Sequence, residues 1–451
     1  MLKKYPFLSG TLLLTLTGVI SRIIGFFYRI YLSHHIGEEG MGIYQLLAPV
    51  MALSFSLTCA GIQTSISKYT ASYIAQKQEK SALRILMTGF TLSLFLSIGT
   101  ACFLYQNAIW VASALLTESR CAPLVRIYSL SLPFACIHSC INGYYYGMKK
   151  SMLPSMSQLV EQLARVGSVF AIYSYGNYMG TPPSIAVTML GILIGEICAT
   201  TLSLGALYFH LSRRNTSPAR RTSTSYLQHL SELLHMAVPL AANRLTLNFL
   251  QSVEAVQIPN RLVLSGMSKS SALANYGVLT GMTYPLILFP SAVTSSVSVL
   301  LLPYISEAGA NGDTAKIKSA IRKSVLACLL LGSFFCILFL FFGPFLGEFL
   351  FGSQLAGTYI QILSIACPLL YLGGILTSIL HGLGKALQAF FLNASCLLVR
   401  LGFVFFLIPK VGMTGYLLGI FVSELCLIVL MSAELTRHLR DVSCKLRSRK
   451  I

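Results

Sequence analysis

Six arginines fall inside long apolar stretches of this 451-residue chain, where a lipid bilayer would surround them. A charged side chain at bilayer depth is costly, so each one predicts either a buried partner or a functional site. Arginine presents a planar fork of donors that suits carboxylate and phosphate oxygens. The six residues are Arg22, Arg29, Arg126, Arg165, Arg244 and Arg400.

Arg22 and Arg244 share one predicted depth. Each lies 14 residues into its apolar stretch, which at about 1.5 Å per helical residue is roughly 21 Å into a core about 30 Å thick. We expect them to form a positive pocket that binds an anionic substrate, with Arg29 as a third substrate contact near its outer mouth. The alternatives are that Arg22 and Arg244 bond backbone carbonyls at a helix break, and that Arg29 extends to the membrane interface.

Two other arginines have carboxylates at similar depth on the following stretch. Because buried charges are usually paired, we predict the structural ion pairs Arg165–Glu196 and Arg400–Glu424. Glu161 lies one turn before Arg165 and competes for it. If Glu161 does not pair with Arg165, it is the candidate site for a coupling proton or cation.

Aspartate is absent from every predicted span, since the chain's two aspartates are Asp313 and Asp441. An exporter of organic cations needs carboxylates in its cavity, so this composition favours an anionic substrate. The stretch GEEGMG at 37–42 lacks the GK[ST] ending of a phosphate-binding loop and predicts a tight outer hairpin. The cysteines lie mostly in apolar runs without CxxC pairs, so we predict no metal site.

The elements that carry these residues are apolar helices. The chain is 55% hydrophobic and 10% charged, and its apolar runs are long enough to cross a bilayer. This predicts an all-α polytopic membrane protein with about 12 transmembrane helices and excludes a soluble domain. The predicted spans lie near residues 8–31, 43–66, 85–106, 124–147, 154–175, 184–210, 230–253, 272–302, 324–345, 359–383, 388–408 and 413–435.

Basic residues are distributed unevenly between the two sets of alternate loops. One set, with both tails, holds 23 of the 33 lysines and arginines, and the other holds four. Basic loops stay in the cytoplasm, so both termini are predicted to be cytoplasmic. The same bias explains the net charge of +19 without a nucleic-acid partner.

The sequence repeats itself. Four short matches recur in order at offsets of 238, 235, 228 and 222 residues: SALR with SAIR, RVG with RLG, GILIGEIC with GIFVSELC, and ANR with ISR. Six spans per half make the repeat parallel, with the substrate site expected between two six-helix lobes. The predicted domains are the lobes 1–211 and 230–436, a basic cytoplasmic linker at 212–229 and a basic tail at 437–451.

Three stretches carry a resemblance to a known family: SRIIGFFYRIYLSHHIGEEGMGIYQLLAP, NGYYYGMKKSMLPSMSQLVEQLARVG and LLLPYISEAGANGD. They resemble the stage V sporulation protein B group of the multidrug/oligosaccharidyl-lipid/polysaccharide exporter superfamily, which also contains the lipid II flippases. By this resemblance Arg22 corresponds to a cavity arginine of those flippases. Their pattern continues Arg-Asp where this chain has Tyr28-Arg29, which favours the sporulation branch.

The resemblance implies a V-shaped fold in a bacterial cell membrane. It also implies flipping of an undecaprenyl-pyrophosphate-linked saccharide, driven by H⁺, Na⁺ or the membrane potential, without an enzyme activity or a cofactor. We expect a monomer. The alternatives are a cation-coupled drug antiporter of the same fold, a non-transporting envelope or sporulation scaffold, and a membrane-embedded glycosyltransferase. The last is disfavoured because acid–base carboxylates and a large outer loop are missing.

Overall fold

The computed structural model describes residues 6–180, 182–213, 226–310 and 314–448, and every element in these ranges is helical. Contacts within the chain define two compact units. Unit 1 comprises Met1–Tyr28 and Leu46–Ser252, and unit 2 comprises Arg29–Gln45 and Val253–Ile451. The units do not follow the predicted lobes because two long helices, α1 (Pro6–Gln45) and α9 (Tyr226–Leu264), each contribute to both. Residues 214–225 of the predicted linker lie outside the described ranges.

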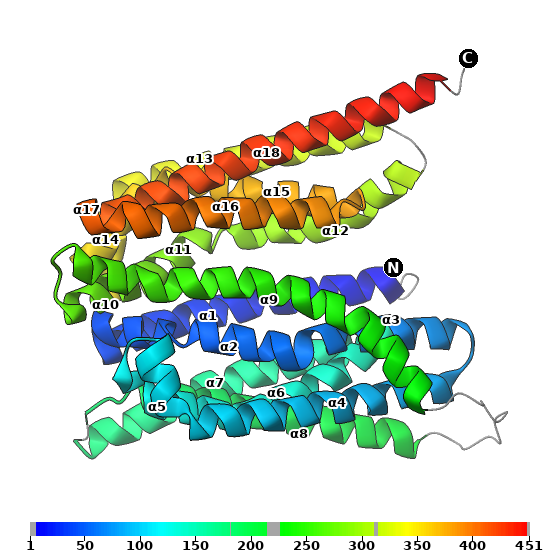
Figure 1. Cartoon of the computed structure of the whole chain (residues 1–451), viewed down its shortest axis with the longest axis horizontal. Coiled ribbons are helices and arrows are strands. Elements are labelled where there is room, and N and C mark those ends of the chain that lie inside the picture. The colour runs from blue at the N-terminus through cyan, green and yellow to red at the C-terminus, as the bar shows by residue number, and fades with distance from the viewer. Residues whose placement is uncertain (1–5, 181, 214–225, 311–313, 449–451) are drawn as a thin grey trace. The chain divides into compact units, whose positions relative to one another are not determined.

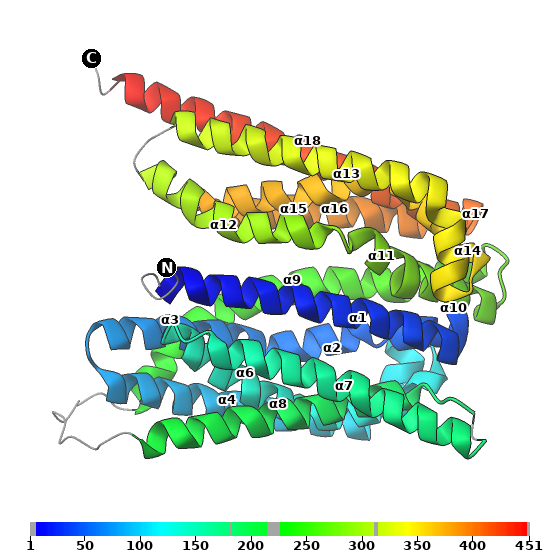
Figure 2. The ribbon, with the colours of Figure 1, turned by 180° about the vertical axis from the view of Figure 1, so that it is seen from behind.

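Unit 1 is a bundle of long helices that run side by side (Figures 1 and 2). Besides its parts of α1 and α9, it contains α2 (Ala48–Phe55), the π-helix η2 (Ser56–Ala60), α3 (Gly61–Ala75), α4 (Glu79–Gln106), α5 (Ala108–Trp110), the π-helix η3 (Val111–Leu115), the 3₁₀-helix η4 (Ser119–Cys121), α6 (Ala122–Gly147), α7 (Met152–Tyr178) and α8 (Ala186–Ser212).

Unit 2 is also a helical bundle, with an apolar core that includes side chains of α12, α13, α15, α16 and α18. Besides its parts of α1 and α9, it contains α10 (Lys269–Gly277), the π-helix η5 (Val278–Thr283), α11 (Tyr284–Leu288), α12 (Ser291–Ala310), α13 (Thr314–Phe351), α14 (Gln354–Ser364), α15 (Cys367–Gly382), α16 (Ala386–Phe406), α17 (Ile408–Val411) and α18 (Met413–Ser448).

The packing partners within the two units correspond. The pairs α3–α6, α4–α6, α6–α8 and α7–α8 of unit 1 match α12–α15, α13–α15, α15–α18 and α16–α18 of unit 2. The π-helices η2 and η5 begin 222 residues apart, the same offset that separates Arg22 from Arg244. These correspondences support the duplication read from the sequence, while the superposition of the two halves stays a prediction.

The ends of α6 and α15 set the register between the two units. Gly147 ends α6 and Gly382 ends α15, and each is followed two residues later by a residue with positive φ, Lys149 (60°) and Gly384 (75°). The offset is 235 residues, as between Arg165 and Arg400.

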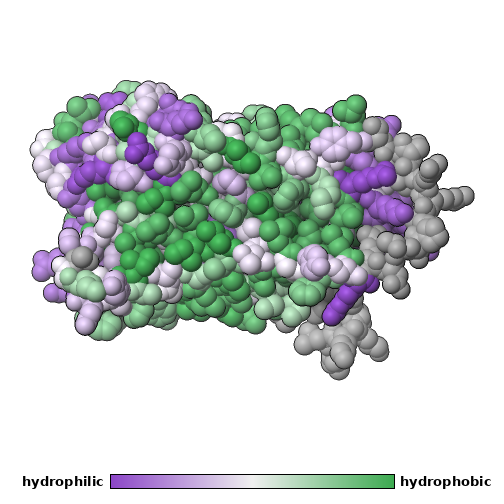
Figure 3. Space-filling model, turned by 90° about the horizontal axis from the view of Figure 1, so that it is seen from below, coloured by the Kyte–Doolittle hydropathy of each residue, from purple (hydrophilic) through white to green (hydrophobic). Residues whose placement is uncertain are grey.

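Eight described helical segments are long and apolar enough to cross a membrane, or nine if the bent pair α14 and α15 counts as one span. Each of the 12 predicted spans coincides with a helix or a run of helices. Figure 3 shows apolar side chains covering the middle of one face, with hydrophilic residues gathered toward the two ends. A contiguous apolar surface of this kind suits a lipid environment.

The predicted hairpin at residues 37–42 is wrong. This stretch continues α1 through a kink at Gly37, whose φ of 68° and ψ of −176° are non-helical. Positive φ is accessible to glycine at little cost. Gly37 therefore marks a kink within α1, and the remaining residues of the stretch are helical.

Candidate functional site: two buried charged clusters

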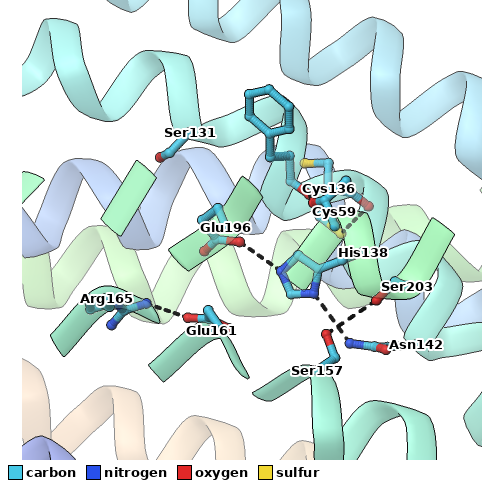
Figure 4. A network of polar contacts seen from close by, with 12 residues as sticks. Cys59, Ser131, Cys136, His138, Asn142, Ser157, Glu161, Arg165, Glu196 and Ser203 are labelled. Carbon is cyan, nitrogen blue, oxygen red and sulfur yellow. Dashed lines mark hydrogen bonds and ion pairs between the residues drawn. The ribbon is translucent and has the colours of Figure 1, made fainter. Parts of the chain in front are cut away.

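A largely buried cluster of charged and polar side chains comes from three helices of unit 1 (Figure 4). His138 comes from α6, Glu161 and Arg165 from α7, and Glu196 from α8. The Nε2 atom of His138 lies 2.8 Å from Oε2 of Glu196, and Arg165 donates to Oε1 of Glu161. One nitrogen or oxygen atom from each of the side chains His138, Glu161 and Glu196 lies within 4.8 Å of the other two.

The close approach of α7 and α8 positions this network. A Cβ added to Gly195 would lie 2.7 Å from the backbone oxygen of Glu161, and one added to Gly191 would lie 2.3 Å from Val169. Glycines spaced four apart let two membrane helices approach closely. Glu196 follows directly after Gly195 and bonds His138, so α8 contacts α7 through its glycines and α6 through this carboxylate.

The ion pairs of unit 1 differ from the predicted Arg165–Glu196 couple. Arg165 pairs with Glu161, and Glu196 bonds His138 instead. The physical reason is spacing, because residues four apart face each other along one helix, whereas Glu196 meets the side chain offered by α6. Glu161 was predicted to bind a coupling ion only if it did not pair with Arg165. Because the two residues do pair, that condition is not met.

Unit 2 holds a second buried cluster. Arg400 on α16 approaches Glu254 on α9, with Nε 2.5 Å from Oε1 and a second nitrogen donating to Oε2 at 2.9 Å. The Tyr416 hydroxyl of α18 donates to Oε1 of Glu254 at 2.8 Å. The predicted partner Glu424 lies 4.0 Å from Arg400, at the limit of an ion pair. Glu254 is therefore the principal partner.

Sequence reasoning missed Glu254 because it ended the seventh span at residue 253, whereas α9 continues to Leu264. It also missed His138, which lies within the predicted fourth span. An ionisable residue inside an apolar run is itself a signal of function. Applied to histidine as well as arginine, that rule finds His138.

The predicted substrate arginines divide between the two units. Arg22 on α1 and Arg244 on α9 are exposed in unit 1. Arg29 belongs to unit 2, where its guanidinium donates to the backbone oxygen of Thr280 at 3.5 Å. Thr280 lies in the π-helix η5, so Arg29 contacts the backbone of an irregular segment.

The comparisons with known proteins identify the family. Residues 7–309 match the family described as polysaccharide biosynthesis protein, and residues 238–406 match the MatE family. The chain belongs to the polysaccharide biosynthesis protein family. It is a multi-pass membrane transporter of the MOP superfamily, and this family consists of transporters rather than enzymes.

The relatives of the chain include two proteins of Bacillus subtilis (strain 168). Stage V sporulation protein B is 29% identical over 98% of this chain and 86% of its own length. Lipid II flippase MurJ is 23% identical over 72% of this chain and 62% of its own length.

Solved transporters share the fold over nearly the whole chain. An inward-facing multidrug resistance MATE family transporter of the MOP superfamily matches with a TM-score of 0.67 and 15% identity, covering 97% of this chain and 98% of that chain. A MOP superfamily transporter from Pyrococcus furiosus matches with a TM-score of 0.66 and 16% identity, covering 98% of this chain and 96% of that chain. The predicted fold class is therefore confirmed, and the fold is that of the MATE transporters.

Proposed function

We propose that this transporter flips a saccharide linked to a polyprenyl pyrophosphate across the cell membrane. The single observation that carries the proposal is the set of arginines Arg22, Arg29 and Arg244, which lie in apolar helices of a chain related to a lipid II flippase. Moving a pyrophosphate through hydrocarbon without compensating charge is prohibitive. Guanidinium groups replace part of its lost hydration and bind its oxygens in pairs.

The carboxylates argue against an organic cation as substrate. Glu161 pairs with Arg165, Glu196 bonds His138, and Glu254 pairs with Arg400. Carboxylates that already have basic partners are poorly suited to attract a cationic drug. The basic partners of these three carboxylates thus favour an anionic substrate over an organic cation.

The proposed transporter acts as a monomer. Both of its termini lie in the cytoplasm, as the distribution of lysine and arginine between the loops indicates. Transport is coupled to H⁺ or Na⁺. Arg22 and Arg244 hold the pyrophosphate at mid-membrane, and Arg29 contacts it nearer the outer side.

A lipid-flipping assay in proteoliposomes tests the substrate arginines. Arg22→Ala and Arg244→Ala should each abolish flipping of a polyprenyl-pyrophosphate-linked saccharide, and the lysine versions should restore it partly because lysine lacks the bidentate fork. Arg126→Ala is the matched control, since Arg126 is another exposed arginine within a helix of unit 1. It should flip lipid like the wild type.

Protein amounts and elution volumes are compared so that loss of folding is recognised. Full flipping by both alanine variants would remove the arginines from the substrate path. The non-transporting scaffold would then become the better account of the chain.

A further inference from the structure

The hydrogen bonds of His138 use both ring nitrogens. Nε2 lies 2.8 Å from Oε2 of Glu196, and Nδ1 lies 3.3 Å from the amide nitrogen of Asn142 (Figure 4). A carboxylate accepts and an amide nitrogen donates, so this network assigns the proton of the neutral ring to Nε2. Nδ1 then accepts from Asn142.

Asn142 offers a second arrangement. Its side chain is buried, and its Oδ1 atom has no hydrogen-bond partner. Rotating the amide by half a turn exchanges Oδ1 and Nδ2. An acceptor then faces Nδ1, so a doubly protonated His138 would donate to Glu196 from one nitrogen and to Asn142 from the other. Both charge states of the ring are therefore satisfied by the same two neighbours.

The charge of the cluster limits the ion that it takes. Glu161 and Glu196 carry two negative charges and Arg165 carries one positive charge, which leaves one negative charge when His138 is neutral. Buried charges are stable only when they are compensated. One proton restores neutrality, whereas a divalent metal ion would leave an excess positive charge beside Arg165.

The donor set also separates the proton from sodium. Hard cations favour oxygen ligands, and imidazole nitrogen suits transition metals instead. Sodium binding at this site would have to replace the bond between His138 and Glu196, which already uses the nearest carboxylate oxygen. The ring and its partners thus match a proton better than either class of metal ion.

We propose that unit 1 contains a single-proton site at His138, in which Glu196 holds the Nε2–H group and the Asn142 amide turns to accept from Nδ1–H. A hydronium ion of the surrounding water supplies the proton: its O–H bond breaks as the N–H bond forms at the lone pair of Nδ1, and a water molecule is left. Release of the proton returns the amide to its present orientation.

The groups around His138 come from several elements. Glu196 on α8, Glu161 on α7 and the Cys136 thiol on α6 itself act on it directly. Arg165 on α7 pairs with Glu161, and the Cys59 thiol on η2 bonds the backbone of Cys136. The two thiols are buried and free. The net charge of the cluster is therefore set by the two glutamates, the arginine and the histidine. The use of this proton to drive transport rests on the proposed function, but the binding of the proton does not.

The test uses substrate-free protein in lipid nanodiscs, with ¹⁵N-labelled histidine observed by NMR. His138→Gln identifies the signal of His138 among the eight histidines. In the wild type this signal should change from the neutral Nε2–H form to the doubly protonated form between about pH 8 and about pH 5, where histidine changes charge. Glu196→Gln and Asn142→Leu should each suppress the doubly protonated form over this range.

The matched control is Glu232→Gln. Glu232 lies 3.6 Å from His229, a second histidine of unit 1 beside a glutamate, and this variant should leave the His138 titration unchanged. Adding sodium at fixed pH should not shift the NMR signal of His138. A tenfold excess of zinc should also leave the signal and its pH titration unchanged.

The wild-type spectrum alone can overturn the proposal. A His138 ring that stays neutral throughout the range, or one that titrates identically in Glu196→Gln, contradicts it, and so does a signal that shifts with sodium or zinc. None of these measurements requires the saccharide lipid. Failure of the flipping assay together with a normal His138 titration would therefore contradict the proposed function and leave the proton site standing.

Discussion

The two charged clusters share only part of their helices by the duplication, and they balance their charges differently. Each contains one arginine and two glutamates, with Arg165 on α7 matching Arg400 on α16. At the register set by the helix ends, the position of His138 on α6 corresponds to Gly373 on α15. Glu196 bonds the imidazole in unit 1, whereas Glu424 lies against the glycine in unit 2, with its Oε2 3.3 Å from where a Cβ would stand.

The difference shows that the duplication kept one arginine and one glutamate of each cluster, whereas the second glutamate comes from α7 in unit 1 and from α9 in unit 2. In unit 2, Glu254 binds the arginine through both oxygens and also accepts from Tyr416, so the arginine is fixed. Tyrosine and arginine keep their charge states near neutral pH. In unit 1 a histidine takes part, and its charge changes in this range. We therefore expect unit 2 to provide structural stability and unit 1 to respond to protons.

The largest expected effect comes from removing the arginine of unit 2. Arg400→Ala leaves Glu254 and Glu424 buried without a counter-charge, and breaking such a pair costs about 3–5 kcal/mol. We expect a large drop in thermal stability, measured by the temperature at which the detergent-solubilised protein loses its monodisperse elution peak.

The control for this change is Arg437→Ala, which removes an exposed arginine of α18 in the same unit. It should leave the midpoint close to that of the wild type. An Arg400→Ala protein as stable as this control would show that Glu254 is neutralised by other means, and the contrast between the clusters would fail.

A smaller effect is expected from Tyr416→Phe. The hydroxyl donates to a carboxylate at 2.8 Å and is buried, and hydrogen bonds to charged groups contribute about 1.5–3 kcal/mol. The same thermal measurement should show a clear loss, and Tyr304→Phe, at a half-exposed tyrosine of unit 2, should show none. Equal midpoints for the two variants would mean that Tyr416 does not help to fix Glu254.

The helices were predictable from sequence, but the partners within them were only partly so. Apolar length located the helices that carry both arginines, and the repeat related Arg165 to Arg400 and Glu196 to Glu424, but Glu254 fell outside the predicted spans. The pairing depends on helix rotation and on which third helix approaches, and neither follows from hydropathy. The sequence therefore did not show that Glu161 rather than Glu196 pairs with Arg165, or that Glu196 bonds His138.

The packing motif of α8 allows a test of how helix approach positions the cluster of unit 1. Gly195→Ala places a methyl group 2.7 Å from the Glu161 carbonyl oxygen, so the helices must separate, at a cost of about 1–3 kcal/mol. Gly205→Ala on the same helix is the control, because no atom lies within 4 Å of its added Cβ. We expect only the first variant to lower the thermal midpoint and to disturb the NMR signal of His138. An undisturbed signal would show that the cluster does not depend on this contact.

The smallest effect is expected at the glycine that replaces the histidine in unit 2. In Gly373→Ala the added Cβ lies 3.3 Å from Oε2 of Glu424 and 3.5 Å from Cδ2 of Leu427, and both atoms are ends of flexible side chains. Alanine favours the interior of a helix over glycine by about 0.5–1 kcal/mol, which offsets a shift of a few tenths of an ångström. Thermal stability should therefore stay within about 1 kcal/mol of the wild type, since the two effects oppose each other.

At the corresponding position of unit 1, His138→Ala removes the hydrogen bond of Glu196 and leaves a buried carboxylate without that donor, which costs about 1–3 kcal/mol. We therefore expect His138→Ala to lower the thermal midpoint more than Gly373→Ala does. Equal midpoints would contradict the contrast, because the histidine would then stabilise its carboxylate no more than the glycine does.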